Sequence, residues 1–388
     1  MLGLASTVSS GSPVESLYSI TLDGTDDKIA LGPSDSMILD GFSGITLSLW
    51  IKTSTAGGYL FSNLRQSDGS NFSLRFHANS ALTGSPLRLE GLILNGSGTL
   101  IKPITTADVA DGAWHHIVLT GKASEQVLYI DGAVAAGDDA TTTGAFGMDA
   151  SSDVAHIGSF GSGSFFDGQI DEVSIWNSAL NLASVQAIYN KGSQYDLTSG
   201  LSIGTGPLVA YYRMGNGFFD DKANGVVHDQ HASGFGSDLT SAIAWTSHNA
   251  GSISTTDGIT TVTIGGGSDG ADQGAMKEVS SLNLHTNSPT YKITLDAWLP
   301  SSGAYASSPT GQWKIYLGGV EATISDLTTT RTTHTVYLRP TDTSDLLIYN
   351  TDADDTSGSF HVASATLKKL NGFSGLTSGG PTFTSDIP

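Results

Sequence analysis

Aromatic side chains that face outward from β-strands are the residues best placed for chemistry, because flat rings stack on the C–H faces of sugars. Apolar residues alternate with others along three expected strands, and this alternation turns five side chains outward: Trp298, Asp296, Tyr316, Tyr337 and Arg339. We expect the three rings to share one face, where the aspartate and the arginine bond sugar hydroxyls. The alternative is that the rings pack under loops or against another subunit.

Metal-binding residue types are present, but their spacing favours no single site. His115 and His116 are neighbours in an expected strand, so they face opposite sides and cannot easily hold one metal ion. His228 and His231 lie in an expected loop, and their spacing does not exclude a metal site there. Calcium (Ca²⁺) is the better candidate, because it prefers the hard oxygen ligands that acidic loops supply. Such loops occur at residues 138–139, 149–153, 220–221 and 352–355, with ordinary solvated turns as the alternative.

The strands that position these residues follow from a two-residue alternation and from turn signals. Ile and Leu occupy the odd positions of residues 45–51, and Phe, Leu and Phe alternate with other residues in 72–76. Asp-Gly and Asn-Gly pairs separate such segments. The pattern predicts an all-β fold of paired sheets with apolar faces inward. Arg75, His77, Arg88 and Glu90 then lie on non-core faces, in a polar cleft or on a solvated sheet.

One segment combines a strand with a short helix. Residues 169–176 alternate as a strand, and apolar positions then recur at steps of three and four residues: Leu182, Val185, Ile188 and Tyr189. Gly192 is a suitable end for this helix. We therefore expect a single helix to close the first domain.

Four motifs accompany this segment: Ser19-Ile-Thr-Leu-Asp-Gly-Thr-Asp-Asp-Lys-Ile, Ile45-Thr-Leu-Ser-Leu-Trp-Ile-Lys, Asp111-Gly-Ala-Trp-His-His-Ile-Val-Leu-Thr and Leu128-Tyr-Ile-Asp-Gly-Ala. In this order they resemble the laminin-G-like, concanavalin A-like lectin/glucanase jelly roll over about residues 18–192. The resemblance implies a β-sandwich. It leaves function open, because the family includes sugar binders, adhesion modules, glucanases and structural domains.

The resemblance also raises the hypothesis of a glucanase. Laminarinase-type relatives carry a Glu-x-Asp-x-x-Glu pattern on one strand, and retaining hydrolysis needs two carboxyl groups about 5 Å apart. Gln169 and Ser174 stand here at the two glutamate positions, with Asp171 between them. We therefore predict that the chain is not an enzyme, and that Asp171 and Glu172 are an ordinary strand pair.

The chain of 388 residues has room for two domains. The prediction is two β-sandwich (jelly-roll) domains, one short helix and two extended tails. Its boundaries are an N-terminal arm (1–17), a laminin-G-like jelly roll (18–192), a connection with added strands (193–249), a second β-sandwich (250–371) and a C-terminal tail (372–388).

The second sandwich resembles the xylan- and glucan-binding type of carbohydrate-binding module, through four stretches that begin at Gly265, Tyr291, Thr333 and Phe360. Its last strand has Val362-Ala-Ser-Ala where that family often places an Asp pair. The departure argues against the structural calcium of that family.

Composition narrows the partners. The net charge is −20, from 37 acidic and 17 basic side chains, which opposes binding to nucleic acid and anionic membranes. Cysteine is absent, so disulfides and thiolate metal sites are excluded. Residues 1–17 lack the basic start and apolar core of a secretory signal, and no apolar run approaches membrane-spanning length. We expect synthesis in a host cytoplasm and no membrane insertion.

The opening Met-Leu-Gly-Leu, followed by Ser and Gly and then a laminin-G-like domain, resembles virion proteins of marine tailed bacteriophages. The resemblance implies an arm that docks on capsid or tail proteins, with a frayed terminus as the alternative. We therefore expect a virion surface protein (capsid decoration, head fibre or tail fibre) that contacts host-surface or environmental glycans, as a homo-oligomer with a trimer favoured. The alternatives are a free glycan-binding lectin-like protein and a polysaccharide-degrading enzyme.

Overall fold

The computed structural model describes residues 17–31, 44–64, 71–77, 88–94, 100–101, 108–122, 125–138, 155–191, 197–198, 208–216, 220–227, 229–230, 235–249, 252–264, 273–284, 289–302, 313–351, 358–370 and 375–388. Strands dominate these residues, with one α-helix among them, which confirms the predicted all-β class. The chain divides into a first unit, residues 1–233 and 372–388, and a second unit, residues 234–371. Each unit has its own apolar core.

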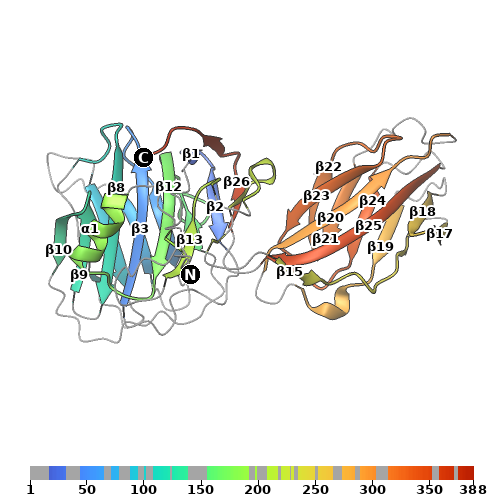
Figure 1. Ribbon diagram of the computed structural model, residues 1–388, viewed down its shortest axis with the longest axis horizontal. Coiled ribbons are helices and arrows are strands. Elements are labelled where there is room, and N and C mark those ends of the chain that lie inside the picture. The colour runs from blue at the N-terminus through green and yellow to red at the C-terminus, as the bar shows by residue number, and fades with distance from the viewer. Residues whose placement is uncertain are drawn as a thin grey trace, which may run out of the picture. The chain divides into compact units, whose positions relative to one another are not determined.

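The first unit is a sandwich of two sheets (Figure 1). In one sheet the order is β10 (Ala133–Asp138), β9 (Glu125–Ile130), β8 (Trp114–Lys122), β3 (Gly44–Lys52), β12 (Asp167–Trp176), β1 (Ser19–Asp23) and β27 (Thr382–Thr384), with β13 (Leu208–Tyr212) also paired to β12. In the other the order is β14 (Val226–Val227), β26 (Gly375–Ser378), β2 (Lys28–Leu31), β11 (Ala155–Ile157), β4 (Tyr59–Leu64), β5 (Asn71–His77), β6 (Arg88–Leu94) and β7 (Leu100–Ile101).

The alternation that predicted these strands also builds the core. Ile45, Leu47, Leu49 and Ile51 of β3 are fully buried, and they pack in one cluster with the phenylalanines and the leucine of β5. Between β9 and β10, Asp131 and Gly132 take positive φ angles of 50° and 73°. An Asp-Gly pair suits such a tight hairpin turn, because both central residues need positive φ.

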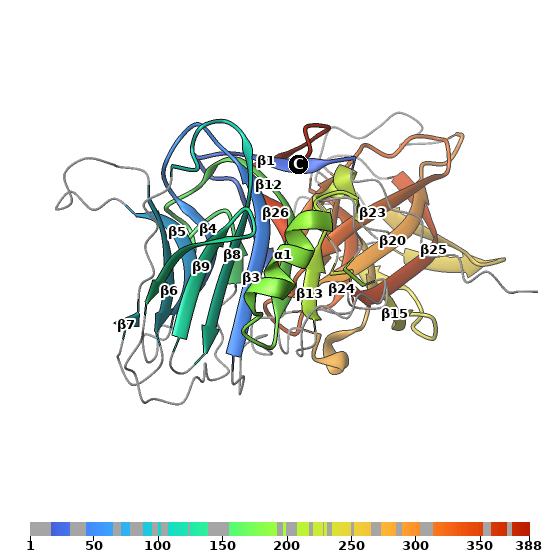
Figure 2. The same ribbon diagram turned by 60° about the vertical axis from the view of Figure 1, so that its left-hand side comes forward.

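Helix α1 (Leu182–Lys191) lies against the outside of the sheet that contains β3, as Figure 2 shows. Val185 and Ile188 are buried there against Val118 and Trp176. Leu182 was expected on the same apolar face, but 41% of it is exposed. The helix itself is confirmed, while the predicted end at Gly192 lies outside the described residues.

The C-terminal segment differs from the predicted tail. Strand β26, which Figure 1 shows beside β2, lies between β14 and β2 in the sheet order, and β27 pairs with β1. Asp386 accepts hydrogen bonds from Lys52 Nζ at 2.6 Å and from Trp114 Nε1 at 3.1 Å. Both strands are too short, at four and three residues, for alternation to reveal them in a Gly/Ser/Thr-rich segment.

The second unit is also a sandwich of two sheets (Figure 1). The sheet that we call the β20 sheet has the order β17 (Ser252–Thr256), β18 (Ile259–Ile264), β25 (Gly358–Leu370), β20 (Tyr291–Trp298) and β23 (Thr332–Leu338), with β15 (Phe235–Asp238) also paired to β25. The β24 sheet has the order β16 (Thr246–His248), β19 (Gln273–Lys277), β24 (Leu346–Asn350), β21 (Trp313–Leu317) and β22 (Val320–Ile324).

The segment predicted as a connection, residues 193–249, contributes strands to both units. β13 and β14 join the first unit, whereas β15 and β16 belong to the second. The second unit therefore begins near residue 234 and not near residue 250. The strands β15 and β16 have four and three residues, so their alternation carries little signal.

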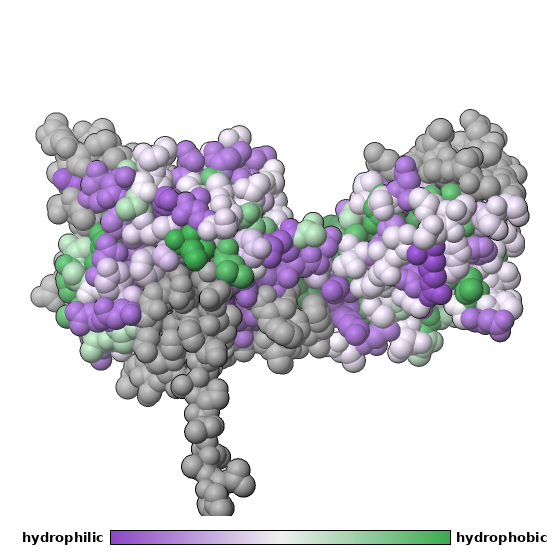
Figure 3. Space-filling view, turned by 45° about the horizontal axis from the view of Figure 1, so that its top comes forward, coloured by the Kyte–Doolittle hydropathy of each residue, from purple (hydrophilic) through white to green (hydrophobic). Residues whose placement is uncertain are grey.

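The visible surface is mainly hydrophilic. Figure 3 shows small green areas separated by purple and white ones. Among the described residues, the large apolar side chains with marked exposure are Leu17, Val134, Leu182 and Leu282. No helix in the described ranges is long and apolar enough to cross a membrane.

Candidate functional site

Four of the five residues predicted to contact sugar lie on the outside of the β20 sheet. Trp298 and Asp296 are in β20, Tyr337 is in β23, and Arg339 directly follows β23. Tyr316 lies in β21, which belongs to the β24 sheet, so the predicted common face for the three rings does not form. Alternation tells inward residues from outward ones, but it does not tell which of two sheets carries a strand.

Trp298 and Tyr337 are also far apart along the β20 sheet. Tyr337 pairs with Lys292, which precedes Trp298 by six residues, or about 20 Å of extended strand. The Lys292 Nζ atom lies 5.6 Å from the centre of the Tyr337 ring. Arg339 Nη2 donates to Thr290 Oγ1 at 3.1 Å. These residues therefore form separate local contacts.

The ring of Trp298 is held by its neighbours. The Arg331 Cζ atom lies 5.1 Å from its centre, and the His361 ring lies 5.2 Å away. Asp296 Oδ2 accepts from Arg331 Nη2 at 2.6 Å and from Nε at 2.9 Å, and Asp296 Oδ1 accepts from Thr333 Oγ1 at 2.7 Å. We call these five residues the Trp298 cluster. A cation already occupies a face of its ring, and its carboxylate is already bonded at both oxygens.

Tyr316 instead lines a pocket of about 410 Å³ on the outside of the β24 sheet. Nine residues line it: His248, Met276, Ser280, Tyr316, Thr343, Ser344, Asp345, Leu347 and Tyr349. The volume is in the range of small-molecule sites, roughly 300–1,000 Å³. Of the residues predicted to contact sugar, Tyr316 is the one in this pocket.

Strand register explains the pocket's floor and walls. Leu347 of β24 lies between Met276 and Tyr316 in one cross-strand row. Tyr349 follows two residues later on the same face of β24, diagonally across from Tyr316. Met276 and Leu347 thus form an apolar floor, and Tyr316 and Tyr349 stand beside it.

Hydrogen bonds fix the rim. Asp345 Oδ1 accepts from the backbone N–H of Ser280 at 2.8 Å, which joins the loop before β24 to the 3₁₀ helix η2 (Ser280–Leu282). The carbonyl of Gly318 accepts from the backbone N–H groups of Thr341 and Asp342 at 2.6 and 3.1 Å. Gly318 has a φ of 52°, in the left-handed region that glycine adopts readily.

A hydrogen bond and an ion pair, linked through Glu321, also fix the Tyr349 ring. Its hydroxyl donates to Glu321 Oε2 at 2.5 Å, and Lys314 Nζ pairs with Glu321 Oε1. The hydrogen bond from Lys314, followed by that from Tyr349, lowers the pKa of Glu321. Contacts within the second unit therefore organise the pocket, which combines an apolar floor, two aromatic rings and a hydroxyl-rich rim.

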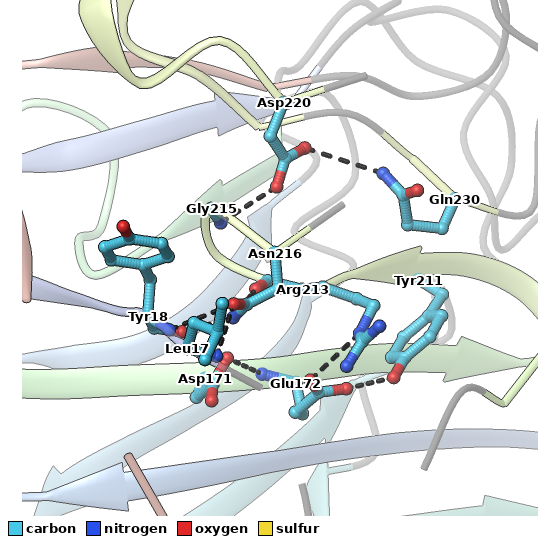
Figure 4. A network of polar contacts seen from close by, with 10 residues as sticks. All are labelled: Leu17, Tyr18, Asp171, Glu172, Tyr211, Arg213, Gly215, Asn216, Asp220 and Gln230. Carbon is cyan, nitrogen blue, oxygen red and sulfur yellow. Dashed lines mark hydrogen bonds and ion pairs between the residues drawn. The ribbon is translucent and has the colours of Figure 1, made fainter. Parts of the chain in front are cut away.

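In the first unit, Asp171 and Glu172 belong to a buried polar network (Figure 4). They stand where the register of β12 against β3 shifts, and Glu172 has a φ of 49°. Glu172 Oε1 accepts from Arg213 Nε at 3.1 Å, and Glu172 Oε2 accepts from the Tyr211 hydroxyl. Burial, and then the charge of Glu172, raises the pKa of Tyr211. Asp171 Oδ1 accepts from the backbone N–H of Glu172 at 2.8 Å.

The adjacent histidines face opposite sides, as predicted. His115 Nδ1 lies 2.8 Å from Asp131 Oδ2, whereas His116 Nε2 is buried 2.8 Å from Ser48 Oγ. They therefore cannot hold one metal ion together.

On the non-core face of β5 and β6, Arg75 Nε donates to Glu90 Oε2 at 2.7 Å, and Glu90 is fully buried. The Arg88 side chain is half-buried on β6, and that of His77 lies outside the described residues. Two of the four residues considered for a polar cleft thus pair with each other.

Sequence reasoning passed over one acidic group. Asp23, Asp26 and Asp27 have carboxylate oxygens within 4.8 Å of one another. Asp27 Oδ2 accepts from the N–H of Asp23 at 3.0 Å, Asp23 Oδ1 accepts from the N–H of Thr25 at 2.8 Å, and burial raises the pKa of Asp27. These bonds stabilise the turn between β1 and β2.

The predicted calcium loops are described only in part. Asp220 Oδ2 accepts from the N–H of Gly215 at 2.8 Å, and Asp221 accepts from the N–H of Asn224 in the 3₁₀ helix η1 (Lys222–Asn224). Asp138 ends β10. Residues 139, 149–153 and 352–355 lie outside the described residues, as do His228 and His231.

Comparison with known proteins identifies the fold of the first unit. Residues 23–186 match the family model for the concanavalin A-like lectin/glucanases superfamily. This match confirms the predicted lectin-like jelly roll for that segment. No curated protein matches the chain.

Several solved structures are similar at low identity. A putative carbohydrate binding protein from Bacteroides ovatus is 20% identical over 55% of this chain and 56% of its own length, with a TM-score of 0.40. Domain 4 of the Geobacillus stearothermophilus arabinanase AbnA, in complex with arabinotriose, is 16% identical over 44% of this chain and 75% of its own (TM-score 0.33). Domains LG4-5 of the mouse laminin α1 chain are 12% identical over 92% and 80% (TM-score 0.33). At these values the likeness carries no argument about ligands.

Proposed function

We propose that this chain is a glycan-binding protein without enzymatic activity on the surface of a tailed-bacteriophage particle, and that the pocket of the second unit binds the glycan. The observation that carries glycan binding is the pocket itself, where Tyr316 and Tyr349 stand beside an apolar floor. A pyranose has apolar C–H faces and a rim of hydroxyl groups, so it needs this combination of aromatic and polar contacts.

The fixed geometry of the pocket supports binding. Glu321 and Lys314 orient Tyr349, and Asp345 joins the two sides of the rim. A ligand therefore need not order these groups when it binds, which lowers the entropic cost of association. The lectin-like fold of residues 23–186 agrees with a carbohydrate partner.

A substitution in the pocket tests glycan binding. An oligosaccharide found by array screening is titrated calorimetrically against wild type and Tyr316→Ala. We expect the variant to lose about tenfold or more in affinity, or at least ~1.4 kcal/mol, because one stacking ring is removed. Trp298→Ala is the matched control, since it removes an outward aromatic ring from the β20 sheet, and its affinity should stay within about twofold of wild type. Equal affinity for wild type and Tyr316→Ala would place the glycan elsewhere.

The proposal of a non-enzymatic protein is supported by Asp171 and Glu172. Both are buried, and each carboxylate accepts a hydrogen bond from a neighbouring residue. Incubation with laminarin, xylan and agar, followed by an assay for reducing ends, should give no turnover. Turnover that a single Asp or Glu substitution abolishes would show that the chain is an enzyme.

The proposal of a virion location rests on the resemblance of the N-terminal segment to virion proteins of marine tailed phages. Deleting residues 1–16 leaves Leu17 and Tyr18, whose N–H groups donate to Asn216 Oδ1 at 2.5 and 3.0 Å. We expect the deleted protein to fold and to bind glycan, but not to associate with particles. Unchanged association would contradict docking through this arm, and a wild-type chain that never associates with particles would be a free lectin.

We further propose that the chain works as a homotrimer. Several pockets on one assembly raise the avidity for a repetitive glycan surface without any new contact. The mass of the purified protein in solution tests this, since a monomer would contradict it.

A further inference from the structure

We infer that the pocket of the β24 sheet selects uncharged saccharides and discriminates against anionic ones, with Asp345 as the residue that sets this preference. The inference rests on the proposed function, because it concerns the ligand of the same site. It adds the chemical class of the glycan, which neither the fold nor the family match specifies.

The charges at the pocket carry the argument. Among the described residues that line the pocket there is one carboxylate, Asp345, and neither a lysine nor an arginine. Lys314, the cation in the adjoining cross-strand row, is already paired with Glu321. A uronate, a sulfate or a sialic acid carboxylate would therefore be desolvated beside like charge without gaining an ion pair to a lysine or an arginine of the lining.

Asp345 is also placed to bond neutral hydroxyl groups. Its Oδ1 atom accepts from the N–H of Ser280, which fixes the carboxylate in the rim. Within the described part of the chain, no donor contacts its Oδ2 atom, so this oxygen can accept from a sugar hydroxyl. The hydroxyls of Ser280, Thr343 and Ser344 line the same rim and can both donate and accept.

Hydrogen bonds to a charged acceptor are stronger than those between neutral groups. A fixed carboxylate thus strengthens the binding of a sugar that offers hydroxyl donors. The same carboxylate repels a sugar that carries a negative charge, so one residue supplies both the attraction and the discrimination.

The test uses the full chain and matched pairs of oligosaccharides that differ only by a carboxylate or a sulfate. We expect wild type to bind the neutral member at least about tenfold more tightly than the anionic one. In Asp345→Asn, the side-chain oxygen that accepts from Ser280 is kept and the charge is removed. The preference should fall to about threefold or less. Raising the salt concentration should narrow the preference of wild type, because salt screens the repulsion.

The outcomes separate the inference from the proposed function. Tighter binding of the anionic member, lost in Tyr316→Ala, would overturn the inference while the pocket remains the glycan site. An unchanged preference in Asp345→Asn, with an unaltered thermal midpoint, would also overturn it. If wild type binds no member of any pair at millimolar concentration, the proposed function and the inference both fail.

Discussion

Two clusters of polar and aromatic residues in this chain use the same side-chain types for different roles, one structural and one for ligand binding. In the first unit, Glu172, Tyr211 and Arg213 are at most 5% exposed, and Glu172 accepts hydrogen bonds from the other two. In the second unit, Tyr316 stands at the wall and Asp345 at the rim of an open pocket. The first cluster holds strands β12 and β13 together, whereas the second leaves ring faces and oxygens for a ligand.

The difference shows that residue type alone does not mark a binding site. A carboxylate and a tyrosine that satisfy each other inside the protein are unavailable to a ligand, however suitable their chemistry. In the pocket, hydrogen bonds to other protein residues fix the side chains without covering the surfaces that face a ligand, as Glu321 fixes Tyr349. Substitutions should therefore cost stability in the buried cluster and affinity in the pocket.

The largest effect is expected for Arg213→Met. The substitution leaves the Glu172 carboxylate buried without its nearest cation, and breaking a buried ion pair in this way costs about 3–5 kcal/mol. Denaturant unfolding should show this loss in the first unit, while glycan affinity stays unchanged. In the double variant Glu172→Gln/Arg213→Met much of the stability should return. A loss below about 1 kcal/mol for Arg213→Met would refute the structural role that we assign to the pair.

A second prediction concerns acid. Burial lowers the pKa of His116 to about 3, against some opposition from Asp131. The folded state therefore keeps His116 neutral, whereas the unfolded state gains a proton below a pKa of about 6.5. The first unit should lose roughly 1–2 kcal/mol of stability from this group between pH 6.5 and pH 5, and the loss should continue toward pH 3.

The variant His116→Gln isolates this contribution. Unfolding curves should be measured for wild type and variant at several pH values. The difference in their free energies of unfolding should shrink as pH falls, because only wild type loses stability through protonation of His116 in the unfolded state. His115 acts in the opposite direction, since hydrogen bonds to Asp131 and Asp111 outweigh burial and raise its pKa. It is present in both proteins and cancels in the difference. A constant difference from pH 7 to pH 5 would contradict the prediction.

The sequence predicted the strands of both sandwiches well where alternation ran for five residues or more. Ile293, Leu295 and Ala297 are fully buried, as are Ile315 and Leu317. The short strands β26 and β27 escaped detection, because three or four residues of Gly, Ser and Thr carry no periodic signal.

The candidate site was predictable only in part. Tyr316 was named as an outward residue, but its partner Tyr349 lies in a run of five buried residues, where alternation gives no direction. The pairing of β21 with β24, which brings the two rings together, depends on contacts distant in sequence. Trp298 illustrates the converse, because no local pattern reveals that Arg331 lies over its ring.

A smaller effect is expected for Glu321→Ala. Removing this acceptor takes away one of the contacts that orient the Tyr349 ring, so ordering the ring on binding costs more, and affinity should fall by about threefold, under 1 kcal/mol. The control Glu321→Gln keeps a hydrogen-bond acceptor and should bind nearly as well as wild type. If Glu321→Ala binds glycan as tightly as wild type, Tyr349 is either rigid by itself or outside the contact.

The smallest effect is expected for Arg331→Ala in the Trp298 cluster, which is exposed like the pocket but bonded internally like the buried network. Arg331 is 48% exposed at its side chain, so its ion pair with Asp296 should contribute at most about 1 kcal/mol to stability. Glycan affinity at the pocket should not change. Removing Arg331 also uncovers a face of Trp298. The variant therefore tests why the pocket on the β24 sheet should bind glycan while the outside of the β20 sheet does not. If an uncovered ring is enough for binding, a second binding event should appear in calorimetry of Arg331→Ala; if a fixed polar rim is needed as well, the stoichiometry should remain that of wild type.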